Sequence, residues 1–240
     1  MISWQIFSRL FSLHWQRRWQ ARRLHGQTAA APLRAYLESP LADRKADWDT
    51  INYLALDLET TGVTPGRDDI LSFGWVCLDG PEIRLETARH RLVRPRRALS
   101  EENVAIHHIT DDCAASGESL HAVLADFLVA LDGRVLIAHY SPTEVRFIDA
   151  ACRACYAGAF LPAVIDTLEL ARRSAPHHLP GKLRLPALRT AHHLPRYPLH
   201  NALSDALAAA ELFLAQAETE SAQRKCHLGQ LLRNQGLVRQ

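Results

Sequence analysis

The stretch from Leu54 to Gly62, LALDLETTG, decides the fold of this chain, because it reads as a β-strand that carries two acids. A strand has a side-chain period of two, so Asp57 and Glu59 share one face while Leu56 and Leu58 point into the core. Two carboxylates this close repel each other, and they stay ionised together only with a cation between them. Oxygen ligands of this kind suit Mg²⁺ or Mn²⁺. The alternative is an edge strand whose solvent face happens to carry two acids.

The three residues that follow the acids favour a ligand site at the end of this strand. Thr60 and Thr61 offer hydroxyl and backbone N–H groups, and Gly62 allows a tight turn with close approach of the backbone to a ligand. We therefore include all three as candidate substrate-binding residues.

Periodicity and turn residues predict strands first, and then alternating strands and helices. Strands are expected at Tyr53–Glu59, Ile70–Leu78, Ile83–Val93, Val135–Ala138 and Ala163–Ile165. Helices are expected at Leu120–Leu131, Pro142–Cys155, Asp166–Arg172, Leu185–Ala191 and Ala202–Gln216. The first three strands form an antiparallel meander, and the whole order predicts an α/β fold around a mixed sheet flanked by helices.

Length and composition divide the chain into one α/β domain with extensions on both sides. We expect a basic, aromatic helical extension over residues 1–48, a main domain over 49–217 and a tail over 218–240. The net charge of +2 says little, but basic residues gather in runs that suit an anionic polymer. These runs are Arg17, Arg18, Arg22 and Arg23, then Arg91, Arg94, Arg96 and Arg97, then Lys182, Arg184 and Arg189.

Cysteine usage and hydropathy favour a cytoplasmic protein. The five cysteines are odd in number and dispersed, which is typical of a reducing compartment. No apolar run is long enough to cross a bilayer.

The first 25 residues combine aromatic and basic side chains at helical spacing. No acid precedes Glu38. We predict a helix that packs its aromatic stripe on the main domain or on a partner, with binding to a membrane surface as the lesser alternative. The aromatic residues are Trp4, Phe7, Phe11, Trp15 and Trp19.

A second set of candidate groups lies just before the Ala- and Leu-rich helix. Asn201 is suited to cap that helix, which places His200 in the preceding loop and Asp205 in the early turns. Both could then reach one site, with Asp205 completing a cation cage and His200 deprotonating a water. Alternatively, His200 is a surface residue and Asp205 a favourable charge near a helix N-terminus.

A third set begins at His139, directly after a predicted strand. Ser141 and Glu144 have the spacing of a capping box, in which Glu144 reaches back to the Ser141 amide. The functional alternative makes Glu144 a further carboxylate of the cation site. The two roles exclude each other.

These three segments, in this order, resemble the motifs of the DEDDh 3′-to-5′ exonucleases, the family of the proofreading epsilon subunits of bacterial DNA polymerase III. The resemblance spans about residues 53–215 and implies an RNase H-like fold. Ile106–Thr110 also resembles a family segment beside the substrate, and it includes His107.

The resemblance implies a role for each matching residue. Asp57, Glu59, Asp205 and Glu144 would be the metal-site acids for two Mg²⁺ or Mn²⁺ ions, and His200 the general base. Glu144 stands where the family usually has aspartate, and Tyr140 where an asparagine commonly follows the histidine. The implied substrate-binding residues are Thr60, Thr61, Gly62, His107 and His139.

The implied activity is release of nucleoside 5′-monophosphates from single-stranded or frayed 3′ ends. The ETTG version of the first motif favours DNA, while trimming of RNA 3′ ends uses the same chemistry. A nucleic-acid-binding accessory protein with a weakened site is the alternative that the Glu144 substitution leaves open. The N-terminal extension is the expected contact for a polymerase or another protein partner.

Overall fold

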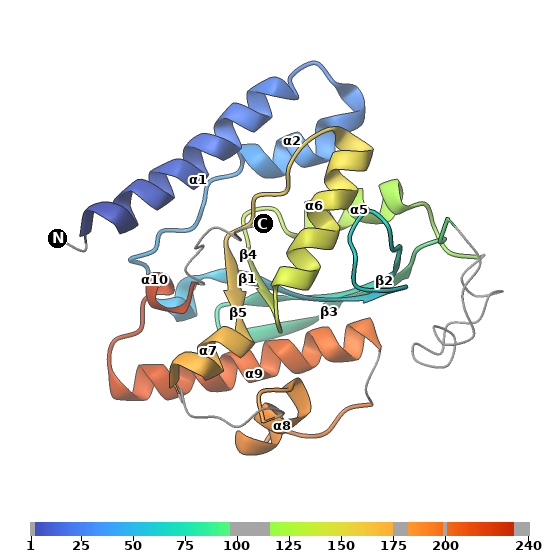
Figure 1. The fold of residues 1–240 in the computed structure, drawn as a ribbon. Helices are drawn as coiled ribbons and strands as arrows, with labels where there is room; N and C mark the ends of the chain where they lie inside the picture. The colour runs from blue at the N-terminus through green and yellow to red at the C-terminus, as the bar shows by residue number, and fades with distance from the viewer. Residues whose placement is uncertain (1–2, 97–115, 175–181, 199–200, 233–240) are drawn as a thin grey trace.

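The computed structural model describes residues 3–96, 116–174, 182–198 and 201–232, and its strands form one sheet between two layers of helices (Figure 1). The strands are β1 Asn52–Thr60, β2 Ile70–Asp79, β3 Glu82–Leu92, β4 Val135–Ala138 and β5 Val164–Asp166. The helices are α1 Ser3–Arg23, α2 Ala31–Glu38, α5 Leu120–Ala130, α6 Pro142–Tyr156, α7 Thr167–Ser174, α8 Leu185–Ala191, α9 Ala202–Gln223 and α10 Leu228–Leu231.

The acid-bearing strand β1 lies at the centre of the sheet. The strand order is β3-β2-β1-β4-β5, with antiparallel pairing among the first three strands and parallel pairing of β4 with β1 and β5. A central strand has neighbours on both sides, so the edge-strand alternative is excluded. The predicted α/β class, the mixed sheet and the N-terminal helices are confirmed.

Both faces of β1 are buried, because helices cover the sheet on each side. Leu54, Leu56 and Leu58 pack in a core that α1, α2, α5 and α6 share. Tyr53 and Ala55 pack on the opposite face against α9 and α10. Since side chains alternate, Asp57 and Glu59 belong to the face that α9 covers.

The Ala- and Leu-rich helix is longer than the sequence predicts. The expected end at Gln216 is wrong, since α9 continues to Gln223. Ala217 is fully buried in the core beneath α9, and Arg224 pairs with Glu220 one turn earlier. Burial of Ala217 stabilises the helix beyond Gln216, although the following residues are mostly polar. The helix α9 therefore crosses the expected domain boundary at residue 217.

The N-terminal extension packs on the main domain by a different face from the one expected. Leu13, Ala21 and Leu24 are buried, whereas Trp15 and Trp19 are 60% and 45% exposed. For these two rings, packing on the main domain is therefore wrong, and packing on a partner stays a prediction. The Arg17 side chain, which lies between them in the sequence, is buried instead, and its guanidinium donates to three backbone carbonyls.

The described cysteines carry free thiols, and no helix within the described ranges has the length and apolar character that a membrane crossing needs.

Candidate active site

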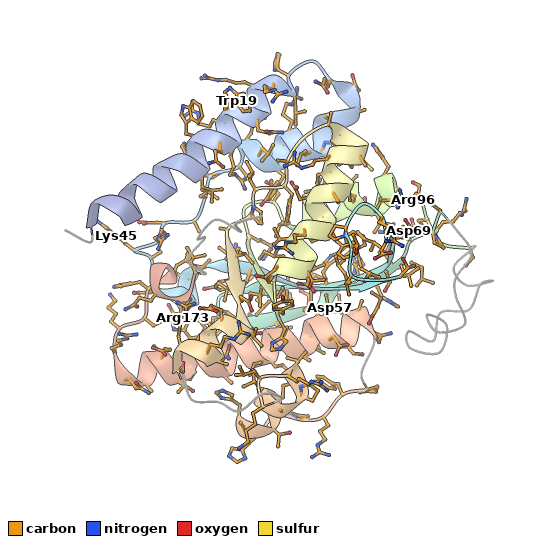
Figure 2. The ribbon with its side chains drawn as sticks, in the orientation of Figure 1. Trp19, Lys45, Asp57, Asp69, Arg96 and Arg173 are labelled. Carbon is orange, nitrogen blue, oxygen red and sulfur yellow. The ribbon has the colours of Figure 1, made fainter. Side chains whose placement is uncertain are left out.

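Three acids from distant parts of the chain meet on the α9 face of the sheet. Asp57 and Glu59 come from β1, and Asp205 comes from the first turn of α9. Each offers a carboxylate oxygen within 4.8 Å of the other two. Asn201 begins α9, since its side chain accepts a hydrogen bond from the Ser204 amide at 3.1 Å. The cap thus fixes the turn on which Asp205 stands, close to Asp57. Figure 2 shows Asp57 near the centre of the molecule.

Two small residues on β2 make room for α9 beside the acids. Gly74 lies opposite Asp57 in the sheet, and Ser72 lies opposite Glu59. A Cβ atom at Gly74 would come within 2.0 Å of the Ala202 carbonyl carbon, so the helix rests directly on the strand backbone. Sequence reasoning missed Gly74. Its signal was a glycine inside an otherwise apolar strand, which often marks a close backbone approach.

The pKa values of the clustered carboxyl groups are raised by burial and by their mutual repulsion. Burial, and then Glu144, Glu59 and Asp205, hold the pKa of Asp57 well above its usual range. Burial and Asp205 raise the pKa of Glu59 to about 7. Loss of hydration penalises the charged form of each acid, and neighbouring negative charge adds to that penalty. The site therefore favours either protons or a bound cation.

Glu144 belongs to this cluster electrostatically and does not form the expected capping box. Ser141 begins α6 without a side-chain cap, so the predicted box is wrong. Glu144 is 5% exposed, and its Oε2 atom has no hydrogen-bond partner among the described residues. Burial is the largest of the effects that raise the Glu144 pKa to about 8. The charge of this carboxyl group contributes to the raised pKa of Asp57, so Glu144 is electrostatically coupled to the acidic cluster.

Asp166 replaces Glu144 at the start of α6, and this tertiary contact explains the correction. Its carboxylate accepts hydrogen bonds from the Ser141 amide at 3.0 Å and from the Ser141 hydroxyl at 3.1 Å. It also accepts from the Tyr140 amide and, as expected of a cap, from the Leu168 amide of α7, both at 3.0 Å. One buried carboxylate thus joins two helix N-termini and positions Glu144 through α6.

The loop after β1 is shaped by the residues assigned to substrate binding. The Thr60 hydroxyl donates to the Gly62 carbonyl at 2.7 Å, and the Thr61 hydroxyl accepts from the Asp69 amide at 2.8 Å. The Thr61 amide donates back to the Asp69 carbonyl at 2.9 Å. Both hydroxyls are thus engaged within the loop, and their contact with a substrate stays a prediction.

The histidines assigned from sequence have different outcomes. His139 is half-buried with Nδ1 2.8 Å from the Thr167 hydroxyl, and burial lowers its pKa. Its neighbour Tyr140 has a φ of +64°, a conformation that asparagine tolerates better than tyrosine. His107 and His200 lie outside the described residues, and their roles stay predictions.

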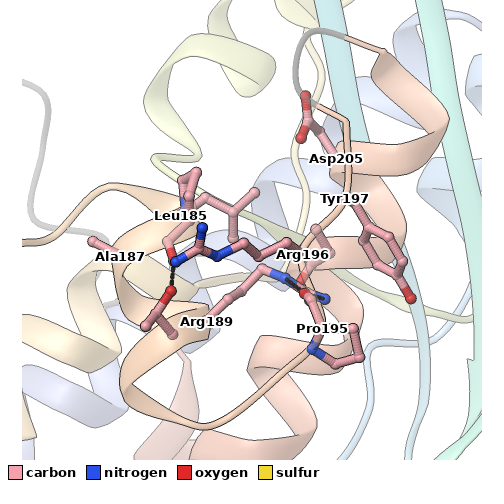
Figure 3. Close-up of a pocket in the computed structure, with 10 residues that line it drawn as sticks. Leu185, Ala187, Arg189, Pro195, Arg196, Tyr197 and Asp205 are labelled. Atoms are coloured by element: carbon pink, nitrogen blue, oxygen red, sulfur yellow. Dashed lines mark hydrogen bonds between the residues drawn. The ribbon is translucent and has the colours of Figure 1, made fainter.

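A pocket of about 400 Å³ opens between α8 and α9, with Asp205 at one end (Figure 3). Buried Arg189 braces its wall by donating to Glu211 at 2.6 Å and to the Pro195 carbonyl at 2.7 Å. The charge of Arg189 is therefore paired with Glu211, although its sequence run suited an anionic polymer. Arg91 and Arg96 are also paired, with Glu118 and Asp69.

The donor set fits a hard divalent cation. Asp57, Glu59 and Asp205 bring three carboxylate oxygens within 4.8 Å of one another, and the buried, unpartnered Oε2 atom of Glu144 belongs to a carboxyl group that interacts electrostatically with Asp57. All-oxygen sites with several carboxylates are characteristic of Mg²⁺ and Mn²⁺. A cation would also remove the repulsion that raises the pKa values of these acids.

Comparisons with known proteins place this chain among nucleases. The exonuclease family profile RNase_T matches residues 54–213, and the chain belongs to this exonuclease family. Its members are hydrolases that act on nucleic acids, so the protein is an enzyme of this class. The predicted resemblance to the DEDDh exonucleases is confirmed.

Among curated relatives, the DNA polymerase III subunit epsilon of Treponema pallidum is 30% identical over 174 residues, which cover 70% of this chain and 79% of the relative. The PolC-type DNA polymerase III of Thermotoga maritima is 30% identical over 78% of this chain, but the match spans 14% of that longer protein.

Two solved structures share the fold. Exonuclease X, solved with 5′-overhanging duplex DNA, superposes with a TM-score of 0.56 at 23% identity and covers 75% of this chain and 98% of its own. The nuclease domain of 3′hExo, a DEDDh family member bound to rAMP, superposes with a TM-score of 0.61 at 16% identity, over 72% of this chain and 95% of its own.

Proposed function

We propose that the protein is a metal-dependent 3′-to-5′ exonuclease that releases nucleoside 5′-monophosphates from DNA 3′ ends. The observation that carries the proposal is the meeting of Asp57, Glu59 and Asp205 within 4.8 Å of one another, with buried Glu144 beside them. Carboxylates that are buried or half-buried and this close repel one another, and a bound cation would allow all of them to stay ionised.

Each residue has a distinct task in this proposal. Asp57, Glu59 and Asp205 would hold two Mg²⁺ or Mn²⁺ ions, and Glu144 would supply further negative charge. When bound, the two cations would activate a water molecule and stabilise charge on the phosphate and the leaving 3′ oxygen. His200 would accept the proton of the attacking water, because the unperturbed pKa of histidine lies near neutrality.

The proposed substrate-binding residues are supported by the sequence motifs and by the loops beside the acids. We propose that Thr60, Thr61 and Gly62, with their loop braced by Asp69, lie along the terminal nucleotide, and that His107 and His139 line the same site. Burial lowers the pKa of His139 and so disfavours its charged form, and we expect it to act as a hydrogen-bonding group.

DNA is favoured over RNA by the curated relatives, which are named as subunits or forms of DNA polymerase III. RNA stays the second candidate, since structural neighbours include 3′hExo bound to rAMP and a 3′-exonuclease that recognises a histone mRNA stem-loop. These neighbours are 16% and 18% identical and share the fold alone.

The test is digestion of matched DNA and RNA oligonucleotides that carry a 5′ label. We expect a ladder of products shortened from the 3′ end in Mg²⁺ or Mn²⁺, faster on DNA, and no reaction in EDTA. A 3′-terminal phosphorothioate should block the ladder. Degradation from the 5′ end, or equal activity of Asp57→Asn and wild type, would overturn the proposal.

His200→Ala gives a separate check on the general base. We expect a loss of about 10²–10⁴-fold in the rate of hydrolysis, the contribution of a positioned acid or base. Metal-induced stabilisation should be unchanged, because His200 is not among the proposed ligands. An unchanged rate would remove His200 from the mechanism. A polymerase or other protein partner for residues 1–48 and a cytoplasmic location stay predictions.

A further inference from the structure

The exposed side of α1 combines aromatic rings and positive charge outside the part of the chain that the exonuclease family covers. The family profile begins at residue 54, while α1 spans Ser3–Arg23. It lies on the outer helical layer, across the sheet from α9 (Figure 1). Any ligand of this surface would therefore bind apart from the acidic cluster.

The described part of α1 is held rigidly against the rest of the molecule. Leu13 and Ala21 of α1, and Leu24 directly after it, are buried. Arg17 is 3% exposed, donates to the Leu161 carbonyl at 2.8 Å, and lies 4.4 Å from the centre of the Tyr36 ring. Because these contacts fix the roll of the helix, the side chains on its other face are presented in a set arrangement.

Two indole rings stand on the exposed face. Trp15 and Trp19 are one helical turn apart, with ring centroids 6.5 Å apart and planes 14° from parallel. The Arg23 guanidinium lies 4.7 Å from the centre of the Trp19 ring. Figure 2 shows Trp19 on the outside of the molecule. Adjacent exposed aromatic rings form a contiguous apolar patch, and patches rimmed by polar residues often mark interaction sites.

A basic stripe runs beside the rings. His14, Arg18, Arg22 and His25 follow one another at helical spacing and line a hollow of about 590 Å³, bordered by Glu38 and Ser39 of the α2 end. The side chains of Arg18 and Arg22 make no ion pair with any described residue. This distinguishes them from Arg91, Arg96 and Arg189, whose charges are matched by acids.

We propose that this surface, formed by Trp15, Trp19, Arg18, Arg22 and Arg23, binds single-stranded nucleic acid. Its chemistry is that of a single-strand platform, in which a positive groove follows the phosphates while bases stack on aromatic rings. The absence of acids before Glu38 makes the surface complementary to a polyanion. A membrane would need a broad apolar face, whereas Leu13 and Ala21, in the part of α1 whose side chains the structure describes, are buried against the domain.

The proposal goes beyond hydrolysis, since the surface would hold a segment of strand away from the acids. It predicts tighter binding of long single strands than of short ones, with no change in the chemistry at the 3′ end.

The test measures binding with hydrolysis switched off, using full-length protein with Asp57→Asn in EDTA. Fluorescence anisotropy follows a labelled thymidine 20-mer, and quenching of indole fluorescence reports contact with the rings. We expect Trp15→Ala/Trp19→Ala to weaken binding by roughly 5- to 150-fold per ring, the range that base stacking on an aromatic side chain supplies. Both rings are exposed, so the thermal midpoint should stay the same.

The basic stripe is tested by salt dependence with a charge-matched control. Arg18→Gln/Arg22→Gln should reduce the slope of log K against log salt by about 0.7 for each lost phosphate contact. Arg89→Gln/Arg153→Gln removes the same charge from exposed positions elsewhere and should leave the slope unchanged. In the Asp57-intact protein, release of nucleotide from a dinucleotide should be equal for all variants, which separates this surface from the proposed activity.

Four results would overturn the proposal. The first two are 20-mer binding by the double tryptophan variant equal to that of the parent protein, and equal salt-dependence slopes for the two double arginine variants. The third is quenching of indole fluorescence by phosphatidylserine vesicles but not by the 20-mer. The fourth is concentration-dependent self-association that the tryptophan substitutions abolish.

Discussion

The acidic cluster and the exposed face of α1 carry charge in opposite ways. The acids on β1 and α9 are buried or half-buried, and burial and repulsion raise the pKa values of Asp57, Glu59 and Glu144. Arg18, Arg22 and Arg23 on α1 are exposed, as are the two rings beside them. The acids need tertiary structure to meet and a cation to coexist. The basic stripe on α1 needs only a helix to form. The packing of the opposite face of α1 on the domain determines which of its side chains stay exposed.

Because of this difference, removing one charged side chain should have different effects in the two regions. Loss of one acid should remove chemistry and relieve repulsion in the metal-free protein. Loss of one base should weaken contact with a polyanion and leave folding unaffected. The predictions below test this contrast, beginning with the largest effect.

The largest effect is expected from Asp57→Asn. It should lower the rate of hydrolysis by at least about 10²–10³-fold, comparable to the loss of one strong electrostatic stabiliser. The metal-free variant should melt at a higher temperature than wild type at neutral pH, because a crowded charge is gone. Oligonucleotide digestion and thermal melting in EDTA measure both. A metal-free variant that melts at a lower temperature than wild type would contradict the proposed repulsion among the carboxylates.

Gly74→Ala should disrupt the cluster without removing an acid. Its Cβ would lie 2.0 Å from the Ala202 carbonyl carbon, so α9 must move away from β2 and carry Asp205 with it. We expect a loss of about 1–3 kcal/mol in the free energy of unfolding, as for overpacked cores, together with weaker metal binding and hydrolysis. Chemical denaturation and metal-induced shifts in melting test this. Gly62→Ala is a control for stability alone, because its nearest neighbour is the side-chain end of Asp68 and Gly62 is itself a proposed substrate-binding residue.

Glu144→Gln separates an acid of the site from a helix cap. Since no capping box forms, we expect stability in EDTA to be equal or higher, while metal affinity or activity falls by about 10–100-fold, as for outer-shell partners of a metal. Glu144→Asp keeps the charge and should retain more activity. Full activity of Glu144→Gln would exclude this carboxyl group from the site.

The smallest effect is the pH dependence of stability without metal. The folded-state pKa values of Glu59 and Glu144 are raised from 4.5 to about 7 and about 8. Folding therefore favours their protonated forms, so stability is fully present below about pH 4.5 and is lost as pH rises to about 8. Melting in EDTA between pH 5 and 9 should show this fall, Mg²⁺ should reduce it, and Glu59→Gln should flatten it. A rise in stability over this range would contradict the assigned causes.

Local patterns predicted much of the fold. Alternation of leucine and acid placed Asp57 and Glu59 on one face of a strand, and Asn201 marked the start of α9. The ends of β4 and α8 coincide with their predictions, because short-range periodicity and turn residues determine such elements. The length of α9 escaped prediction, since its last turns depend on burial of Ala217 against another part of the chain.

The sequence by itself determined the order of the motifs, the class of enzyme that they resemble and the charge of the N-terminal helix. Tertiary structure alone decided three points. Asp166 displaces Glu144 from the helix end, Gly74 allows α9 to bring Asp205 to the strand, and Arg17 is buried so that Trp15 and Trp19 remain outside. Each depends on contacts between residues far apart in the chain, and such contacts leave no periodic signal in a single sequence.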